Sequence, residues 1–231
     1  MTIKRIYLDM DGVLCDFERK YTEVFGEPSM YGTDHPPSFH KNWEKFVQND
    51  LFSFLEYFPG AENLLKFINS ECVWERYIQV MILSSSGGHG YETKITKQKE
   101  QWLIGKEIYY NPIVVPGRRF KCLYANKHSV LIDDVEKNIT QFKEKGGHGI
   151  VHTSAEDTIP EVRNGIIKWL GCAFVVAGAL LTAFNIYPLN LVVLNCGIIF
   201  YVIWSLIVKE MSILVLNIVL FVIYLVGYLS N

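Results

Sequence analysis

Four carboxylates follow two apolar runs of this chain, and their chemistry is the first clue to a function. Asp9 and Asp11 come directly after the first run, and Asp133 and Asp134 come after a later one. Carboxylates gathered at one place repel each other unless a cation lies among them, and hard oxygen ligands suit Mg²⁺. A magnesium ion beside a carboxylate nucleophile suits phosphoryl transfer, in which charge on the phosphoryl oxygens is neutralised.

A bound phosphoryl group also needs hydrogen-bond donors. Ser84 and Ser85 end a third apolar run, so their hydroxyls are candidates, and a lysine would complete the cradle. The neighbouring run Gly87-Gly-His-Gly90 is not a P-loop, because it lacks the Gly-Lys-Ser/Thr ending of that motif. We interpret it as a flexible loop.

The elements that must position these side chains alternate along the chain. Apolar runs predict strands at residues 3–10, 77–83, 112–115, 130–132 and 149–152. Helical spacing predicts helices at residues 17–25, 39–58, 61–69, 93–104 and 135–145. This alternation indicates a parallel sheet with helices on both faces, in which ligands bind at the carboxyl ends of the strands. The carboxylates and serines follow strands, so we expect them to meet at that edge.

Two motifs carry a resemblance to a known superfamily. The run Asp9-Met-Asp-Gly-Val-Leu-Cys-Asp-Phe17 closely resembles the first motif of the haloacid dehalogenase (HAD) phosphatases, and Leu131-Ile-Asp-Asp134 resembles their fourth. The segments Leu51–Ala61 and Lys99-Glu-Gln-Trp102 are similar to segments of the 5′(3′)-deoxyribonucleotidase branch. The resemblance covers about residues 3–155. It implies an α/β fold, a Rossmann-like HAD core with a parallel sheet and a small helical cap.

The resemblance also implies roles for the carboxylates. Asp9 would attack phosphorus and become a phospho-aspartate, while Asp11 would protonate the leaving hydroxyl and then deprotonate water. Mg²⁺ would be held by Asp9, by the backbone carbonyl of Asp11 and by Asp134. Asp133 would help directly or through water. These roles predict a magnesium-dependent phosphatase.

The phosphate would be bound by Ser84, Ser85 and a lysine. Lys121 is favoured because Lys121-Cys-Leu-Tyr-Ala125 resembles the Lys-x-x-x-Ala stretch of the family, and Lys127 stays open because about two extra residues follow that stretch. This chain has Ser84-Ser-Ser-Gly87 where the branch usually has Thr-Ser-Pro. The substrate therefore stays open between a nucleotide and a sugar phosphate or another small monoester.

The cap, about residues 17–60, is rich in aromatic side chains. Phe17, Trp43 and Phe46 are candidates to stack on a base, together with Phe52 and Tyr57. Closure of the cap would exclude water other than the attacking molecule.

Composition limits the classes of molecule that this protein is expected to bind. The formal net charge of −2 gives no basic footprint for a nucleic-acid polymer. The five cysteines are odd in number and contain no Cys-x-x-Cys pair, which indicates free thiols in a reducing compartment.

Charge is spread unevenly along the chain. From Trp169 to Asn231 only Lys209 and Glu210 carry a formal charge. A helix that crosses a bilayer needs about 20 apolar residues, so the sequence predicts three transmembrane helices. They would lie at about residues 166–186, 189–208 and 211–229.

The basic residues near these spans predict their orientation. Arg163 and Lys168 precede the first span, Lys209 falls on the same side after two crossings, and the loop Asn185–Asn190 has no basic residue. By the positive-inside rule, the phosphatase domain would face the cytoplasm.

The predicted organisation is a HAD-like domain at residues 1–158, a linker at 159–165 and a membrane segment at 166–231. One interpretation of that segment is an anchor that self-associates into a homo-oligomer within the lipid bilayer. The other is half of a small-solute transporter, similar to proteins of the SemiSWEET or PnuC type. A separate alternative for the whole chain is a membrane transporter or scaffold whose soluble domain only binds phosphate ligands.

Overall fold

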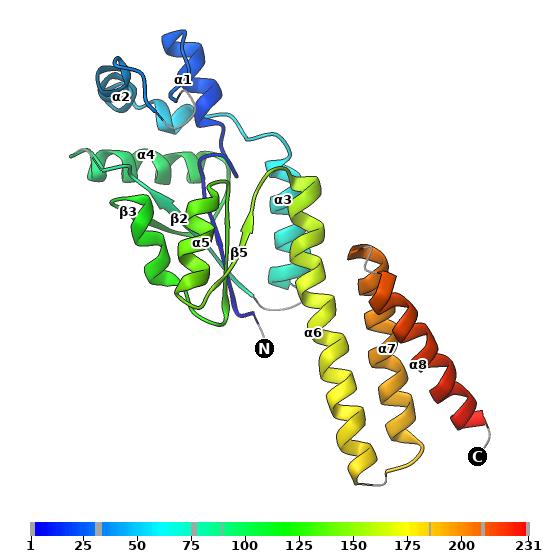
Figure 1. Ribbon diagram of the computed structural model, residues 1–231. Coiled ribbons are helices and arrows are strands. Elements are labelled where there is room, and N and C mark those ends of the chain that lie inside the picture. The colour runs from blue at the N-terminus through cyan, green and yellow to red at the C-terminus, as the bar shows by residue number, and fades with distance from the viewer. Residues whose placement is uncertain are drawn as a thin grey trace. The chain divides into compact units, whose positions relative to one another are not determined.

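The computed structural model describes residues 3–30, 34–74, 78–88, 90–184, 186–208 and 211–229. The chain forms two compact units, Met1–Thr158 and Ile159–Asn231 (Figure 1).

Five parallel strands form the sheet of the first unit, in the order β3-β2-β1-β4-β5. They are β1 (Arg5–Leu8), β2 (Gln79–Ser85), β3 (Asn111–Val115), β4 (Ser129–Asp133) and β5 (His148–Val151). The register pairs Leu8 of β1 with Ile82 and Ile132 on its two neighbours, so the carboxyl ends of the three central strands lie side by side. The predicted α/β, Rossmann-like core is confirmed.

The central strands are apolar on both sides because the sheet is covered on both faces. Leu8, Ile82 and Ile132 are fully buried. One face packs Tyr7, Leu83 and other side chains against Phe142 of α5. Burial of each such side chain contributes about 1.5–3 kcal/mol, so this layer fixes where the strand ends lie.

The helices of the first unit are α1 (Phe17–Phe25), α2 (Phe39–Gln48), α3 (Ala61–Phe67), α4 (Glu92–Gly105) and α5 (Glu136–Glu144). Short helical turns are η1 (Leu51–Phe54), η2 (Ile68–Trp74) and η3 (Arg118–Tyr124). The helix expected at residues 39–58 is wrong in its second half, because α2 ends at Gln48 and Asp50 takes a φ of 56°. This left-handed turn separates α2 from η1.

The elements α1, α2 and η1 form the cap around a cluster of aromatic rings. Phe17 stacks on Phe52 with 5.7 Å between centroids, and Phe46 meets both of these rings edge-on. The buried side chain of Gln98 in α4 ties the cap down, since its amide donates to the Val47 carbonyl oxygen at 2.8 Å and to Asp50 Oδ1 at 2.9 Å.

The second unit consists of α6 (Ala155–Ala183), which begins in the first unit, α7 (Leu189–Val208) and α8 (Met211–Leu229). Residues 159–165, expected as a linker, are helical and lie within α6. Glycines bring α6 and α7 together, since a Cβ on Gly178 would lie 2.5 Å from Leu194 and one on Gly197 would lie 2.8 Å from Val175.

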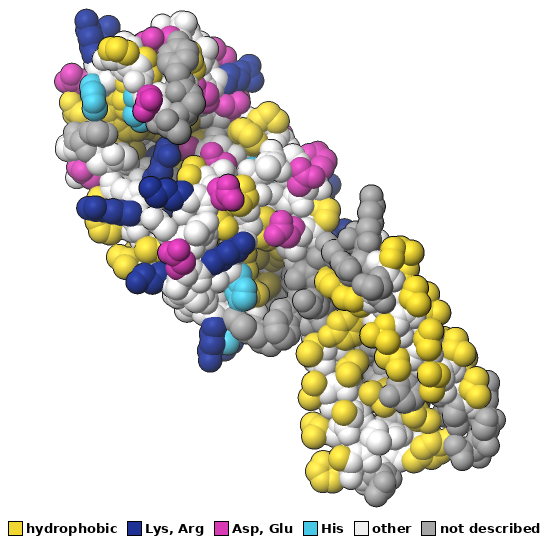
Figure 2. All heavy atoms as spheres, viewed as in Figure 1, with side chains coloured by type: hydrophobic (Ala, Val, Ile, Leu, Met, Phe, Trp, Pro, Cys, Tyr) yellow, Lys and Arg dark blue, Asp and Glu magenta, His cyan; other side chains and the backbone are white. Residues whose placement is uncertain are grey.

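Among the described residues, one helix is long and apolar enough to cross a membrane, over Leu189–Leu206 of α7. The apolar runs in α6 and α8 are shorter, Gly171–Ala183 and Ile213–Ile223. Figure 2 shows hydrophobic side chains gathered over this unit. The predicted turn residues Asn185, Lys209 and Glu210 lie outside the described residues.

Candidate active site

Asp9 follows the last residue of β1 and is held at the edge of the sheet. Its backbone N–H donates to the Ile132 carbonyl oxygen at 2.9 Å, and its Oδ1 accepts the Met10 N–H at 2.8 Å. Only 6% of the residue is exposed. One carboxylate oxygen is thus fixed by the backbone, which orients the other toward the ends of the neighbouring strands.

Lys121 joins Asp9 to the end of β4. Its buried ammonium lies 2.6 Å from Asp9 Oδ2 and 2.7 Å from Asp133 Oδ2. Burial lowers the pKa of Lys121, but the two carboxylates outweigh it and raise the pKa above its usual value. The lysine therefore stays charged and holds two like charges together.

Asp133 is buried and saturated by its own neighbours. Its Oδ1 accepts the Val135 N–H at 2.9 Å and the Asn138 amide at 2.8 Å, while its Oδ2 accepts from Lys121. These bonds use both oxygens, so Asp133 positions Lys121 and the loop after β4.

The Asp134 carboxylate lies against the backbone of Gly12. A Cβ on Gly12, where φ is +77°, would lie 2.4 Å from Asp134 Oδ2. Glycine in the Asp-x-Asp-Gly motif is therefore required twice, by the left-handed backbone and by the close approach of the carboxylate.

Oxygens of Asp9, Asp133 and Asp134 lie within 4.8 Å of one another. Loss of hydration in this crowded loop, together with the charges of Asp9 and Asp133, raises the pKa of Asp134 to about 7. Such crowding of carboxylates is what a bound cation relieves. The residues present therefore fit a divalent metal ion.

A second lysine, Lys99 of α4, completes the cluster on the side of β2. Its buried ammonium donates to Asp11 Oδ2 at 2.6 Å, to Ser84 Oγ at 2.7 Å and to the Ser85 carbonyl oxygen at 2.9 Å. Asp11 Oδ1 also accepts from Cys15 Sγ at 3.5 Å. Lys99 thus links the loop after β1 to the end of β2.

Sequence reasoning assigned no role to Lys99, although it opens the Lys-x-x-Trp segment. The available signal was its spacing, because Ile95, Lys99 and Trp102 lie on one buried stripe of α4. A lysine on the buried face of a helix needs a partner, and here that partner is Asp11.

The structure brings together most of the predicted site. Six of the predicted residues lie at the carboxyl ends of β1, β2 and β4: Asp9, Asp11, Ser84, Lys121, Asp133 and Asp134. Ser85 follows Ser84, but its hydroxyl accepts the Gly87 N–H at 3.0 Å. Lys127 is exposed, which favours Lys121 as the lysine beside the nucleophile. The roles of these residues stay predictions.

The aromatic candidates divide into three groups. Phe17 and Trp43 are partly exposed, and a Cβ on Gly87, in the loop after β2, would lie 3.2 Å from the Trp43 ring. Phe46 is fully buried in the cap, so in this structure it is a core residue without a free face for a base. Phe52 is also buried, with its ring centroid 5.3 Å from Lys99 Nζ. The Tyr57 ring lines a separate cavity.

Comparisons with known proteins give two findings. Residues 2–169 match the sequence profile of a protein family described as 5′ nucleotidase, deoxy (pyrimidine), cytosolic type C protein. Among solved structures the chain resembles "the crystal structure of a hydrolase from Streptococcus pneumoniae TIGR4", with 13% identity, a TM-score of 0.43, and coverage of 71% of this chain and 100% of that chain. A comparison with curated proteins found no match.

Proposed function

The chain belongs to the family of deoxy (pyrimidine) cytosolic type C 5′-nucleotidases, which are HAD-type phosphatases, and on this premise we propose that it hydrolyses a nucleoside monophosphate through a phospho-aspartate at Asp9. The observation that carries the mechanism is the convergence of two aspartate–lysine pairs at one edge of the sheet. Lys121 pairs with Asp9, and Lys99 pairs with Asp11.

In the first step a carboxylate oxygen of Asp9 attacks phosphorus, and the bond to the nucleoside oxygen breaks. Asp11 would enter this step protonated and give its proton to that oxygen, and it is partly exposed and held by Lys99 beside the cradle. In the second step water attacks the phospho-aspartate, with Asp11 taking its proton. The products are a nucleoside and inorganic phosphate, and Asp9 is restored.

Charge balance supports a role for Mg²⁺. When all four carboxylates are ionised, they and the two ammonium groups leave the cluster with two negative charges, which one divalent cation would neutralise. Asp9, Asp134 and the backbone carbonyl of Asp11 are the groups that would hold it, while the saturated Asp133 supports them. When bound, the ion would neutralise charge on the phosphoryl oxygens.

Phosphate binding is assigned to donors of this chain. Lys121 uses two of its three N–H groups for Asp9 and Asp133, which leaves one for a phosphoryl oxygen. Lys99 uses all three for Asp11, Ser84 and Ser85, so it would act through its charge. Both charges are fixed before substrate arrives, so little reorganisation is required when negative charge develops. The Ser84 hydroxyl already accepts from Lys99 and can donate its own proton to a phosphoryl oxygen. Among the candidates to stack on a base, Phe17 and Trp43 keep free surface for a nucleobase.

Release of phosphate from a panel of ribo- and deoxyribonucleoside monophosphates and sugar phosphates, with and without Mg²⁺, tests this proposal. We expect nucleotides to be hydrolysed best, EDTA to stop turnover, and Asp9→Asn to abolish it while the circular dichroism spectrum stays unchanged. Turnover by Asp9→Asn would exclude Asp9 as the nucleophile. A preference for sugar phosphates would support the alternative substrate class.

For the C-terminal unit we propose attachment to a membrane, with the phosphatase domain in the cytoplasm. The support is the long apolar helix α7 and its exposed side chains, among them Val192 and Leu206. Resistance of the full chain to extraction by alkaline carbonate, together with access of protease to residues 1–158 only from the cytoplasmic side, tests both parts. Release by carbonate would reject the membrane attachment.

A further inference from the structure

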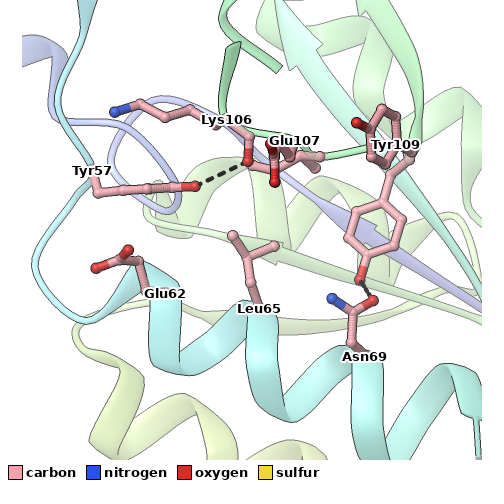
Figure 3. A pocket seen from close by; sticks show the side chains of 9 residues that line it. Tyr57, Glu62, Leu65, Asn69, Lys106, Glu107 and Tyr109 are labelled. Atoms are coloured by element: carbon pink, nitrogen blue, oxygen red, sulfur yellow. Dashed lines mark hydrogen bonds between the residues drawn. The ribbon is translucent and has the colours of Figure 1, made fainter. Parts of the chain in front are cut away.

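A cavity lies in the first unit, between α3 and the segment that follows α4 (Figure 3). Its volume is about 410 Å³, within the range of small-molecule sites. It contains none of the aspartates of the candidate active site. One wall is Tyr57, whose ring packs edge-on against Trp102 with 5.6 Å between centroids.

The walls of this cavity are rich in tyrosine. Tyr57 and Tyr109 lie on either side of Leu65 in Figure 3, and 83% of Tyr109 is exposed. The third ring, Tyr110, is fixed by a hydrogen bond from its hydroxyl to Asn69 Oδ1 at 2.6 Å. Aromatic faces placed around a wet cavity attract cations through their quadrupoles.

One of these rings already contacts a cation of the chain, the ammonium group of a lysine. The ammonium of Lys106 lies 4.6 Å from the centroid of the Tyr57 ring. The nearest carboxylate to that ammonium, Glu56, is 3.9 Å away and largely exposed. The lysine side chain is itself partly exposed, so another cation can compete with it for the ring.

Carboxylates outnumber ammonium groups around the cavity. Glu62 projects from α3 and Glu107 from the segment after α4, whereas Lys106 is the one basic residue among the described residues that line this cavity. Burial raises the pKa of Tyr57, and the charges of Glu62 and Glu107 raise it further. The negative charges of Glu62 and Glu107 therefore act on the ring that Lys106 covers, and they disfavour the binding of an anion there.

A left-handed backbone turn at Glu107 forms part of the cavity wall. Glu107 has a φ of 57°, which is uncommon for a residue with a side chain. The turn is closed by hydrogen bonds from the Glu107 N–H to the Ile104 carbonyl oxygen at 3.0 Å and from the Ile108 N–H to the Leu103 carbonyl oxygen at 2.9 Å. A glycine would adopt this φ with less strain, but it would remove the carboxylate from the cavity.

We propose that this cavity is a binding site for an organic cation, an ammonium or guanidinium group that stacks on Tyr57 and pairs with Glu62 and Glu107. A free amine and a basic side chain of a peptide share this chemistry. The site is separate from the phosphatase centre and does not depend on its mechanism.

Ligand-observed NMR on the full-length chain in detergent tests the proposal with four probes of similar size: butylammonium, butylguanidinium, butanol and butyrate. We expect both cations to bind and the neutral and anionic probes not to bind. An acetylated Gly-Lys-Gly amide peptide distinguishes the two sources, because tighter binding of the peptide would assign the site to a protein partner.

Variants make the test specific. Tyr57→Leu removes the ring and should weaken cation binding about 2- to 30-fold, the range of cation–π energies, whereas Tyr57→Phe keeps the ring and should bind nearly as well as the parent. Glu62→Gln should also weaken binding. Lys106→Met removes the competing ammonium, so we expect it to strengthen binding by about 2- to 5-fold.

The Lys106→Met variant distinguishes a cation site from an anion site in which Lys106 binds the ligand. If Lys106 were itself the ligand-binding group, its removal would abolish binding and butyrate would be the preferred probe. Either result would overturn the proposal, as would cation binding that is unchanged in both Tyr57→Leu and Glu62→Gln. Thermal unfolding of each variant shows whether loss of binding reflects loss of the fold.

Discussion

Lys99 and Asp11 are 88 residues apart in the sequence, yet the lysine ammonium donates to the aspartate Oδ2 at 2.6 Å in a largely buried pair. The same ammonium contacts Ser84, so one side chain ties the loop after β1 to the end of β2. The position of Asp11 therefore depends on α4, and through Gln98 of that helix the cap is attached to the same element.

Replacement of Lys99 by methionine should lower turnover of a phosphate ester by about 10²- to 10³-fold, because a fixed positive charge beside the reacting phosphoryl group is removed and Asp11 loses its anchor. Steady-state kinetics of the purified chain measure this effect. Lys97→Met is the matched control, since Lys97 is exposed on the same helix. Equal kinetics for the two variants would exclude Lys99 from the site.

Replacement of Gly12 by alanine should abolish most of the turnover and weaken Mg²⁺ binding, because the new Cβ would displace the Asp134 carboxylate. Gly26→Ala is the control, since Gly26 has a φ of +72° and nothing within 4 Å of an added Cβ. Both variants should lose about 1–2 kcal/mol of unfolding free energy from backbone strain. Urea denaturation and Mg²⁺ titration separate the shared strain from the specific clash.

Replacement of Lys121 by methionine should lower the free energy of unfolding by about 3–5 kcal/mol at neutral pH, because Asp9 and Asp133 would be left buried without a cation. Urea denaturation measures this loss. Lys127→Met, at an exposed position, should change stability little. A stable Lys121→Met variant would show that the two carboxylates tolerate each other without the lysine.

Acidification should destabilise the first unit through His152. Burial lowers the pKa of this imidazole below 6.5, and its Nδ1 is hydrogen-bonded to Thr158 Oγ1 at 2.8 Å. The unfolded chain then binds the proton more readily, so the unfolding free energy falls as pH drops below about 6.5 and keeps falling until the folded imidazole titrates. Above that pH, His152 adds no pH dependence.

Urea denaturation at several pH values between 7.5 and 5 measures this slope. His152→Gln should reduce the fall in unfolding free energy on acidification relative to the parent, whereas His148→Gln, at an exposed position, should match the parent. The raised pKa of Asp134 acts in the opposite sense over this range, and this contribution is common to all three proteins. The same slope in all three proteins would assign the acid sensitivity to other groups.

The sequence by itself determined the architecture of the first unit and the location of its candidate site. Alternating apolar runs and helical segments require a parallel sheet, and such a sheet aligns the carboxyl ends of its strands. Asp9, Ser84 and Asp133 each follow or end a strand, so their meeting at one edge follows from topology. The long uncharged stretch after residue 169 likewise predicts apolar helices before any packing is known.

Only the tertiary structure decided which side chains face that edge. Lys99 and Lys127 both lie in polar stretches of the sequence, but the packing of α4 buries one while the other stays exposed. Phe46 and Tyr57 are aromatic residues of one predicted cap, yet one fills its core and the other faces a different cavity. Local spacing shows which residues share a face, as it does for Lys99, but what that face meets depends on how elements distant in sequence pack together.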